Sequence, residues 1–119
     1  MTISYNRLGS NGRLGNQMFQ YASLRGIANY NQYQWMIPPP DCNHRDNYGL
    51  FDTFEMKHCK PENLGFNDGM TITEKTHAFD DSMFYCTDGV NIDSYLQTED
   101  YFVHIADQIR EDFTFKKDY

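Results

Sequence analysis

The residues with the clearest chemistry lie in a glycine-rich stretch near the start of the chain, Gly12-Arg13-Leu14-Gly15-Asn16. The guanidinium of Arg13 can hold a phosphate or a carboxylate, because it presents paired hydrogen-bond donors. Asn16 offers both a donor and an acceptor to sugar hydroxyls. The backbone N–H groups at the start of a following helix would add an anion-binding end. These residues predict a site for an anion and a polyol.

The same glycines also have a purely structural interpretation, as a turn in which glycine is needed only for backbone geometry. Gly9, Gly12 and Gly15 follow the spacing G-x-x-G-x-x-G, which differs from the G-x-G-x-x-G of dinucleotide sites. These glycines are not followed by the Lys and Ser or Thr that a P-loop requires. These two nucleotide motifs are therefore excluded, and the turn and the binding site stay open as alternatives.

Four side chains have the chemistry of zinc ligands, namely Cys42, His44, His58 and Cys59. Neither pair has the usual spacing of a zinc finger or a zinc ribbon. The pattern favours surface histidines and core cysteines, and we expect neither a metal nor a cofactor.

Two pairs of adjacent carboxylates, Asp80-Asp81 and Glu99-Asp100, are the candidates for a general base. Neighbouring residues in a strand face opposite sides, and carboxylates at the start of a helix act as caps. Catalysis by either pair is therefore the less favoured interpretation, and the sequence does not identify the base.

Aromatic residues and lone histidines give weaker hypotheses. Tyr30, Tyr33 and Trp35 could form a platform on which a sugar stacks, although such residues more often pack in a core or on a sheet. His77 and His104 stand alone in the sequence, which favours structural or exposed roles.

A strand, a glycine turn, a helix and a second strand follow one another at the start of the chain. Residues 2–8 alternate as in a strand, and residues 33–37 form an apolar run that three prolines end. Between them, residues 16–30 carry apolar side chains at helical spacing. This order opens a parallel α/β unit. The predicted fold is α/β, a Rossmann-like parallel sheet with flanking helices.

The rest of the chain predicts shorter elements and one further helix. Residues 41–69 predict short elements and loops, and residues 71–76, 83–87 and 90–96 predict strands. A last helix should begin after Thr98, a good N-cap, because acidic residues follow it. Its apolar face would consist of Phe102, Ile105, Ala106, Ile109 and Phe113.

The composition limits which classes of partner and which cellular compartment we expect. The 119 residues fit one domain, and the net charge of −7 opposes nucleic acid and anionic membranes. The sequence has no apolar run long enough to span a membrane and no signal-peptide pattern at its start. The three cysteines form no C-x-x-C pair, which favours free thiols in a reducing compartment. We therefore expect a cytoplasmic protein.

Two strings resemble one enzyme family. Residues 13–22, Arg-Leu-Gly-Asn-Gln-Met-Phe-Gln-Tyr-Ala, resemble the N-terminal signature of the α-1,2-fucosyltransferases, glycosyltransferase family 11. Residues 93–102 are similar to that family's Gly-Tyr-Phe-Gln-Ser-Glu-Lys-Tyr-Phe segment, and residues 109–113 follow in the expected place. The first string is quite specific and the second moderately so. Together the resemblance covers essentially the whole chain, with the middle only loosely matched.

The resemblance implies a GT-B fold, in which two Rossmann-like domains face each other across a cleft. Residues 1–119 would be the single N-terminal lobe. The family transfers fucose from GDP-fucose to the 2-hydroxyl of a galactoside with inversion and without a required metal. By this resemblance, Gly12, Arg13, Gly15 and Asn16 would face the cleft near the donor, and the partners would be a sugar nucleotide and a glycan acceptor.

The family's donor motif, His-x-Arg-Arg-Gly-Asp, is absent from this sequence. Its arginine pair grips the diphosphate and stabilises the charge on the leaving group. We therefore expect the C-terminal donor-binding lobe to lie outside this chain and the isolated chain to be inactive. Two hypotheses follow. The chain is a fucosyltransferase lobe that a C-terminal lobe completes, in the same protein or in trans, or it is a non-catalytic module that binds a glycan or a second copy of itself.

Overall fold

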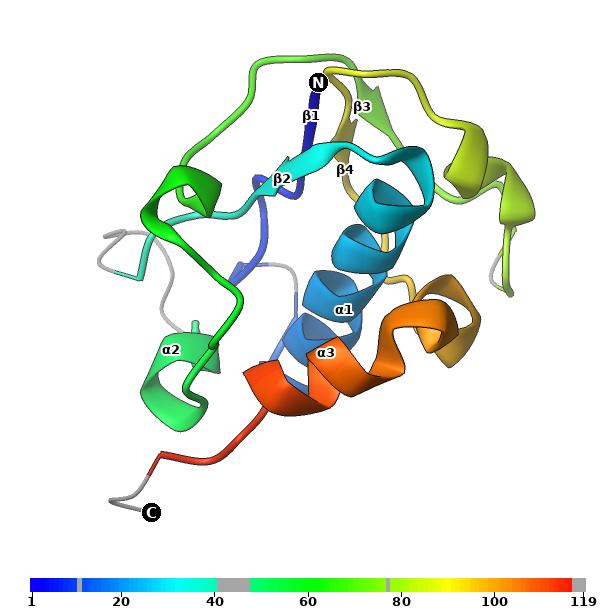
Figure 1. Cartoon of the computed structure of the whole chain (residues 1–119). Helices are drawn as coiled ribbons and strands as arrows, with labels where there is room; N and C mark the ends of the chain where they lie inside the picture. Colours follow the sequence, from blue (N-terminus) through cyan, green and yellow to red (C-terminus); the bar gives the residue numbers. More distant parts are fainter. Residues whose placement is uncertain (11, 41–47, 77, 117–119) are drawn as a thin grey trace.

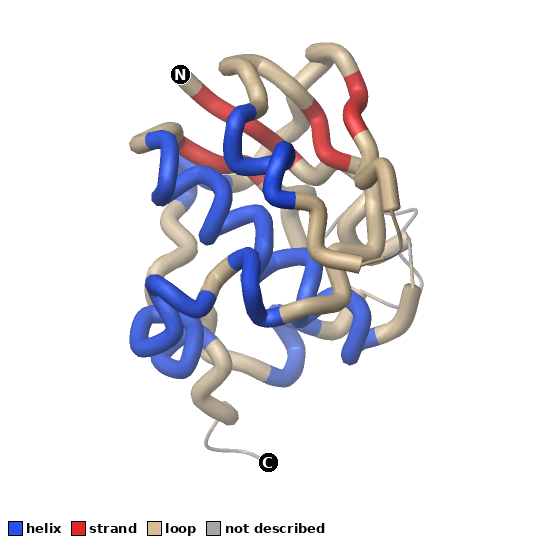
Figure 2. Tube along the Cα trace, turned by 90° about the vertical axis from the view of Figure 1, so that its right-hand side faces the viewer, coloured by secondary structure: helices blue, strands red, loops and turns tan. Residues whose placement is uncertain are grey.

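The structure is a computed structural model that describes residues 1–10, 12–40, 48–76 and 78–116. A parallel sheet of four strands lies at its centre, in the order β2-β1-β4-β3. Strand β1 spans Thr2–Ser4, β2 spans Gln34–Met36, β3 spans Thr71–Ile72 and β4 spans Asn91–Ile92. In Figure 2 the strands lie together at the top and most of the helices below them. The prediction of an α/β fold with a parallel sheet and flanking helices is confirmed at this level.

Helix α1, Leu14–Asn31, connects β1 to β2 and covers one face of the sheet (Figure 1). Its apolar face packs against the two strands, where the rings of Tyr21 and Trp35 lie 5.4 Å apart in an edge-to-face arrangement. The helix ends at Gln32, whose left-handed backbone lets its N–H group donate to the carbonyls of the last turn. The predicted helix over 16–30 is confirmed, with two residues more at its start and one at its end.

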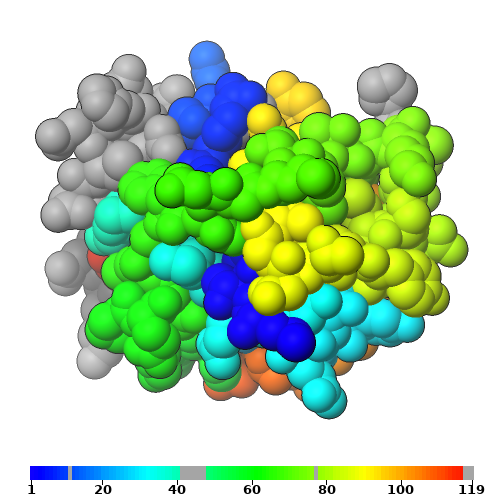
Figure 3. All heavy atoms as spheres, turned by 90° about the horizontal axis from the view of Figure 1, so that it is seen from above, coloured from blue at the N-terminus to red at the C-terminus, as the bar shows by residue number. Residues whose placement is uncertain are grey.

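The other face of the sheet carries a row of polar side chains. Ser4, Asn91 and Thr71 lie side by side on adjacent strands and form a chain of side-chain hydrogen bonds of 3.4 and 3.2 Å. Asn67, in the segment that leads into β3, exchanges hydrogen bonds of 3.1 and 2.6 Å with Asn6. In Figure 3 this green segment lies next to the blue N-terminus and the yellow segment leading into β4.

Three of the predicted strands are shorter than expected. Residues 2–8 contribute three residues to β1, and residues 71–76 and 90–96 contribute two each to β3 and β4. The remaining residues of these segments turn away at the carboxyl ends of the strands and form loops. Residues 41–69 were expected to hold short elements, and the described part of this segment holds α2, Leu50–Thr53, and the 3-10 turn η1, Pro61–Asn63.

The strand predicted over 83–87 is wrong, because a 3-10 helix, η2, occupies Asp81–Tyr85. Asp80 begins this helix, and its carboxylate accepts the backbone N–H of Ser82 at 3.1 Å and the hydroxyl of Ser82 at 2.6 Å. A side-chain cap of this kind satisfies the N–H groups at the start of a helix and competes with extended structure.

The predicted last helix is divided into three parts: η3, Glu99–Tyr101, η4, Val103–Ile105, and α3, Ala106–Asp112. Thr98 caps the first part as predicted and accepts the backbone N–H of Asp100 at 3.3 Å. The break lies where the chain meets α1. A Cβ atom on Gly26 would collide with the carbonyl of Tyr101, so the two backbones pack directly on each other. Phe102 leaves helical geometry at this point, with φ −135° and ψ 8°.

A buried ion pair joins α1 to α3. Arg25 pairs with Asp112, and these side chains are 7% and 0% exposed. Asp112 also accepts hydrogen bonds of 2.6 Å from the hydroxyl of Tyr21 and from the backbone N–H of His58. The second amino group of Arg25 donates to Gln108 at 2.8 Å. Both charges are hydrogen-bonded, with Arg25 Nε alone lacking a described partner, and the pair holds the interior of α1 against the C-terminal end of α3.

Within the described residues, no helix has both the length and the apolar character that crossing a lipid bilayer demands.

Candidate functional site

The carboxyl ends of the strands share one edge of the sheet, as in every parallel sheet. Three of the segments that leave the sheet there form the site: residues 5–10 and 12–13 after β1, residues 73–76 after β3 and residues 93–97 after β4. Ligands of open α/β sheets bind at this edge. Both parts of the candidate site, the start of α1 and a cavity, are built from these segments.

The first part is the turn that leads into α1. Gly9 and Gly12 have φ angles of +91° and +110°, which a residue with a side chain rarely adopts. Arg13 follows in an extended conformation, with φ −91° and ψ −171°, and α1 begins at the next residue. The glycines therefore do what the turn interpretation requires, and they also bring Arg13 to the start of a helix of 18 residues.

Arg13 is exposed at this helix start and forms no ion pair with any residue the structure describes. The first turn of α1 contains no acidic residue. Among the described residues, no acceptor is present for the backbone N–H groups of residues 14–16. The start of a helix carries the equivalent of about half a positive charge. An anion placed here would meet a guanidinium and several N–H donors together.

Gly15 and Asn16 lie in the first turn of the same helix. Gly15 is exposed, and a Cβ atom added to it would meet nothing within 4 Å. Asn16 is half-buried beneath the turn, where a Cβ atom on Gly12 would lie 2.6 Å from its side-chain nitrogen. The four predicted site residues therefore lie together because they are consecutive, with Arg13 and Gly15 open to solvent.

Gln17 fixes this turn and was not recognised from the sequence. Its side chain is fully buried, donates from Nε2 to the carbonyl of Gly12 at 3.2 Å and accepts the backbone N–H of Gly49 at 3.1 Å. The signal in the sequence was a glutamine on the side of the helix that faces the protein, where an apolar residue would be expected. This side chain ties the turn to the start of α2.

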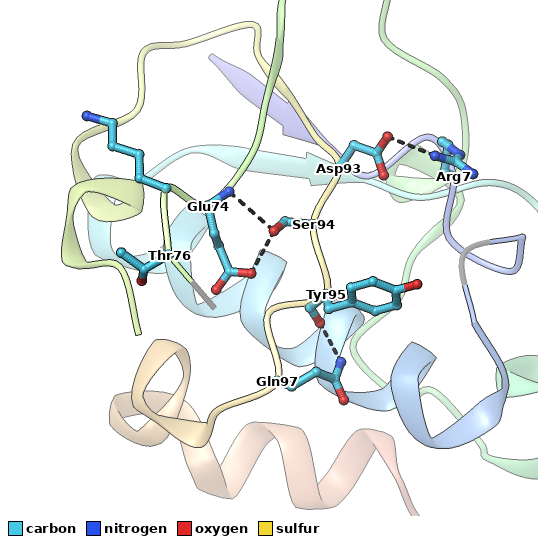
Figure 4. A pocket seen from close by; sticks show the side chains of 8 residues that line it. Arg7, Glu74, Thr76, Asp93, Ser94, Tyr95 and Gln97 are labelled. Carbon is cyan, nitrogen blue, oxygen red and sulfur yellow. Dashed lines mark hydrogen bonds and ion pairs between the residues drawn. The ribbon is translucent and has the colours of Figure 1, made fainter. Parts of the chain in front are cut away.

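The second part of the site is a cavity of about 390 Å³ at the same edge of the sheet (Figure 4). All three segments contribute to it, so that residues far apart in the sequence line one space. The lining residues are Arg7, Glu74, Lys75, Thr76, Asp93, Ser94, Tyr95 and Gln97.

Three of the four charged groups of this cavity are paired or hydrogen-bonded, and the Lys75 side chain forms no ion pair with a described residue. Arg7 forms an ion pair of 3.0 Å with Asp93. Glu74 accepts the hydroxyls of Ser94 and Tyr101, both at 2.6 Å. Burial, together with the bond to Glu74, raises the pKa of the Tyr101 phenol, so this residue remains a hydrogen-bond donor at any ordinary pH. None of these lining residues was singled out as a binding residue from the sequence, because the strand order that unites them is not visible there.

The three aromatic residues proposed as a sugar platform do not form one. Trp35 packs against Tyr21, with the Arg25 guanidinium 5.4 Å from the centre of its ring. Tyr33 donates its hydroxyl to a backbone carbonyl at 3.2 Å. Tyr30 is exposed but packs on other aromatic rings. The hypothesis is wrong, because residues 33 and 35 pack inward at the start of β2 while residue 30 lies near the end of α1.

The zinc hypothesis concerns residues that are only partly described. Cys42 and His44 lie outside the described residues. His58 Nε2 lies 3.7 Å from a carboxylate oxygen of Glu111, and burial raises the pKa of the Cys59 thiol to about 12. The described residues contain no group of three side chains that could hold a metal ion.

The carboxylate pairs lie at helix starts, where Asp80 caps η2 and the other three residues stand in first turns. Hydrogen bonds from the Ser82 side chain and the Lys75 backbone lower the pKa of Asp80, which makes it a weaker base than an ordinary carboxylate. Glu99 and Asp100 form the first turn of η3.

The structure describes one of the two lone histidines. His104 Nε2 lies 2.9 Å from the carbonyl oxygen of Gly26, a structural contact between η4 and α1. This agrees with the structural role expected for it. His77 lies outside the described residues.

The candidate site thus has two parts at one edge of the sheet. The start of α1 offers an exposed cation and N–H donors to an anion, and the cavity offers paired charges, hydroxyls and an aromatic ring. Comparison of the chain with models of protein families, with curated proteins and with solved structures gave no match.

Proposed function

We propose that this chain is the N-terminal lobe of a fucosyltransferase-type glycosyltransferase and that it binds the phosphates of a GDP-sugar at the start of α1. The observation that carries the proposal is the exposed Arg13 next to the first-turn N–H groups of a long buried helix. The resemblance of residues 13–22 to the fucosyltransferase signature supports the same position.

The overall charge of −7 repels a nucleotide diphosphate, so the binding free energy has to come from local groups. A charge-assisted hydrogen bond contributes roughly 1.5–3 kcal/mol, and a helix N-terminus adds roughly 0.3–1 kcal/mol. One arginine and one helix start together supply about 1.8–4 kcal/mol and therefore predict a Kd for GDP between about 1 and 50 mM. Affinity of this order suits a lobe that forms one wall of a donor site.

The proposal gives the other residues of the turn distinct roles. The absence of a side chain at Gly15 allows a phosphate to approach the helix backbone closely. Asn16 would orient the sugar through its side-chain amide. Gly12 shapes the turn through its positive φ angle.

Binding and transfer are separate in this proposal. The 119 residues contain no His-x-Arg-Arg-Gly-Asp motif, and this motif's arginine pair stabilises the leaving diphosphate in the family that the chain resembles. We therefore propose that the chain alone binds the donor without transferring fucose, and that a second lobe supplies the remaining cations.

The binding claim is tested by titrating GDP into the purified chain and into two variants. Arg13→Ala should weaken binding about tenfold, the loss expected for one charge-assisted hydrogen bond. Arg110→Ala is the matched control, because Arg110 is also exposed but pairs with Asp107 at 2.8 Å on α3. It should change the Kd by less than about twofold. Equal effects of the two variants would remove Arg13 from the site.

The transfer claim is tested with GDP-fucose and lactose. The chain alone should release no GDP, and a second polypeptide that carries His-x-Arg-Arg-Gly-Asp should restore release. Release by the chain alone contradicts its insufficiency. Absence of GDP binding together with self-association in sedimentation would instead support the non-catalytic module and end the proposal.

A further inference from the structure

A strained residue stands between two residues that line the cavity, Tyr95 and Gln97. Leu96 has a φ angle of +53° although it is bulky and fully buried, a conformation that costs roughly 1–3 kcal/mol. Its N–H group donates to Glu74 at 3.1 Å, and its carbonyl accepts the hydroxyl of Ser23 at 3.2 Å. The surrounding residues hold this backbone turn in place. As a result, Leu96 points into the core while its neighbours Tyr95 and Gln97 are exposed and line the cavity.

The charges of the cavity balance. Its lining contains the two cations Arg7 and Lys75 and the two carboxylates Glu74 and Asp93. Arg7 and Asp93 neutralise each other, and Glu74 receives donors from two hydroxyls and a backbone N–H, while Lys75 forms no ion pair with a described residue. Three of the four charges are therefore already compensated, and a charged ligand would have to compete for them or depend on Lys75 alone. The lining therefore favours a neutral ligand over a phosphate or a carboxylate.

The uncharged groups are those that bind sugars. Tyr95 is 56% exposed, and its ring extends from the 93–97 segment on the side where Arg7 lies (Figure 4). Gln97 donates its amide to the carbonyl of Tyr95, which leaves the side-chain oxygen as an acceptor. The hydroxyl of exposed Thr76 already donates to the carbonyl of Ala78 at 3.2 Å and accepts its N–H group at 3.3 Å, so it adds one further acceptor position. An aromatic face with hydroxyl and amide groups around it matches the apolar face and the hydroxyl rim of a pyranose ring.

We propose that this cavity binds a neutral saccharide, with Tyr95 stacking on the sugar ring and Gln97 and the Arg7–Asp93 pair bonding its hydroxyls. The volume of about 390 Å³ lies at the lower end of the range typical of small-molecule sites. As a saccharide site, the cavity is independent of the proposed nucleotide site at the start of α1. As the site of an acceptor sugar, it rests on the proposed function.

The experiment titrates methyl glycosides of galactose, glucose and mannose into the isotopically labelled chain and follows the amide resonances by NMR, without any nucleotide. At least one glycoside should give saturable shifts in residues 73–76 and 93–97. Tyr95→Ala should weaken that binding about three- to tenfold, as expected for the loss of a stacked ring. Tyr95→Phe should retain most of it, since the ring remains.

Tyr85→Ala is the control, because Tyr85 is 72% exposed and lies outside this cavity. Its effect should stay below about twofold. The proposal is overturned if no glycoside binds at about 100 mM, if Tyr95→Ala and Tyr85→Ala act alike, or if glucose 6-phosphate or glycine binds in the cavity more tightly than every neutral glycoside. Glycoside binding without GDP binding would leave this inference intact and refute the proposed function. The reverse result would refute only this inference.

Discussion

At the scale of single residues, Gly12 and Gly15 differ in what an added side chain would meet. A Cβ atom on Gly12 would crowd the Asn16 side chain, and the φ angle of +110° would strain any replacement. A Cβ atom on Gly15 meets open space. Substitution of Gly12 would therefore mix a folding defect with a binding defect, whereas substitution of Gly15 separates them.

Gly15→Ala should leave the free energy of unfolding unchanged or raise it by up to about 1 kcal/mol, because alanine is the better helix former. It should nevertheless weaken GDP binding severalfold, because the methyl group occupies the space through which a phosphate approaches the backbone. Urea unfolding and a GDP titration measure the two effects. Unchanged affinity in a stable variant would show that no ligand approaches this turn closely.

Asp80 gives a pH dependence with a defined sign. Hydrogen bonds from the Ser82 side chain and the Lys75 backbone lower its pKa from 3.8 in the folded state. Its ionised form therefore stabilises the fold above the unfolded pKa, and this contribution is lost as the pH falls through the lower folded pKa. Asp80→Asn should be less stable than the wild type near pH 7, and the difference should shrink toward about pH 3.

The exposed neighbour of this residue supplies the control. Asp81 lies in the first turn of η2, and Asp81→Asn should change the free energy of unfolding less than Asp80→Asn does at pH 7. Urea unfolding at both pH values makes the comparison. A gap between wild type and Asp80→Asn that is the same at both pH values would contradict the role given to this carboxylate.

At the scale of the elements, the contact between α1 and α3 depends on the buried pair Arg25–Asp112. Asp112→Ala leaves Arg25 buried without its partner and also removes the acceptor of the Tyr21 hydroxyl. Breaking a buried pair in this way costs about 3–5 kcal/mol, a large part of the stability of a small domain. We expect a loss of that order in the free energy of unfolding measured in urea.

The same helix contains an exposed ion pair for comparison. Asp107 and Arg110 lie 2.8 Å apart with side chains 94% and 76% exposed. Asp107→Ala should change stability by less than about 1 kcal/mol, because water screens such pairs. If the two aspartate substitutions cost the same, the burial of the Arg25–Asp112 pair would not be what holds the helices together.

The elements that could be predicted are those whose pattern is long and local. α1 repeats its apolar face over several turns, so its type and extent followed from the sequence. The last helix failed because its break at Phe102 depends on contact with Gly26, far away in the chain. The strand predicted over 83–87 failed because the cap formed by Asp80 outweighs a weak extended preference.

At the scale of the whole molecule, one part of the candidate site could be predicted from the sequence and the other could not. The residues at the start of α1 are consecutive, so the sequence was enough to bring them together. The cavity joins residues after β1, β3 and β4, and only the strand order β2-β1-β4-β3 places those loops side by side. A strand order of this kind depends on long-range pairing, which no local pattern in a single sequence encodes.

The polar face of the sheet accounts for part of the unusual composition. The mean hydropathy is −0.74. Apolar residues of α1, the sheet and the segments around α2 form the core, whereas Ser4, Asn91 and Thr71 form a hydrogen-bonded chain on the opposite face of the sheet. The segment that leads into β3 is fixed to this face by the hydrogen bonds between Asn67 and Asn6.

Binding of a sugar nucleotide's phosphates at the start of α1 is decided by an NMR titration of the labelled chain with GDP. Saturable shifts should be largest in the amides of residues 12–16, and Arg13→Ala should weaken the binding that they report about tenfold. Shifts centred on residues 73–76 and 93–97, or no shifts at GDP concentrations well above about 50 mM, would show that the phosphates do not bind there.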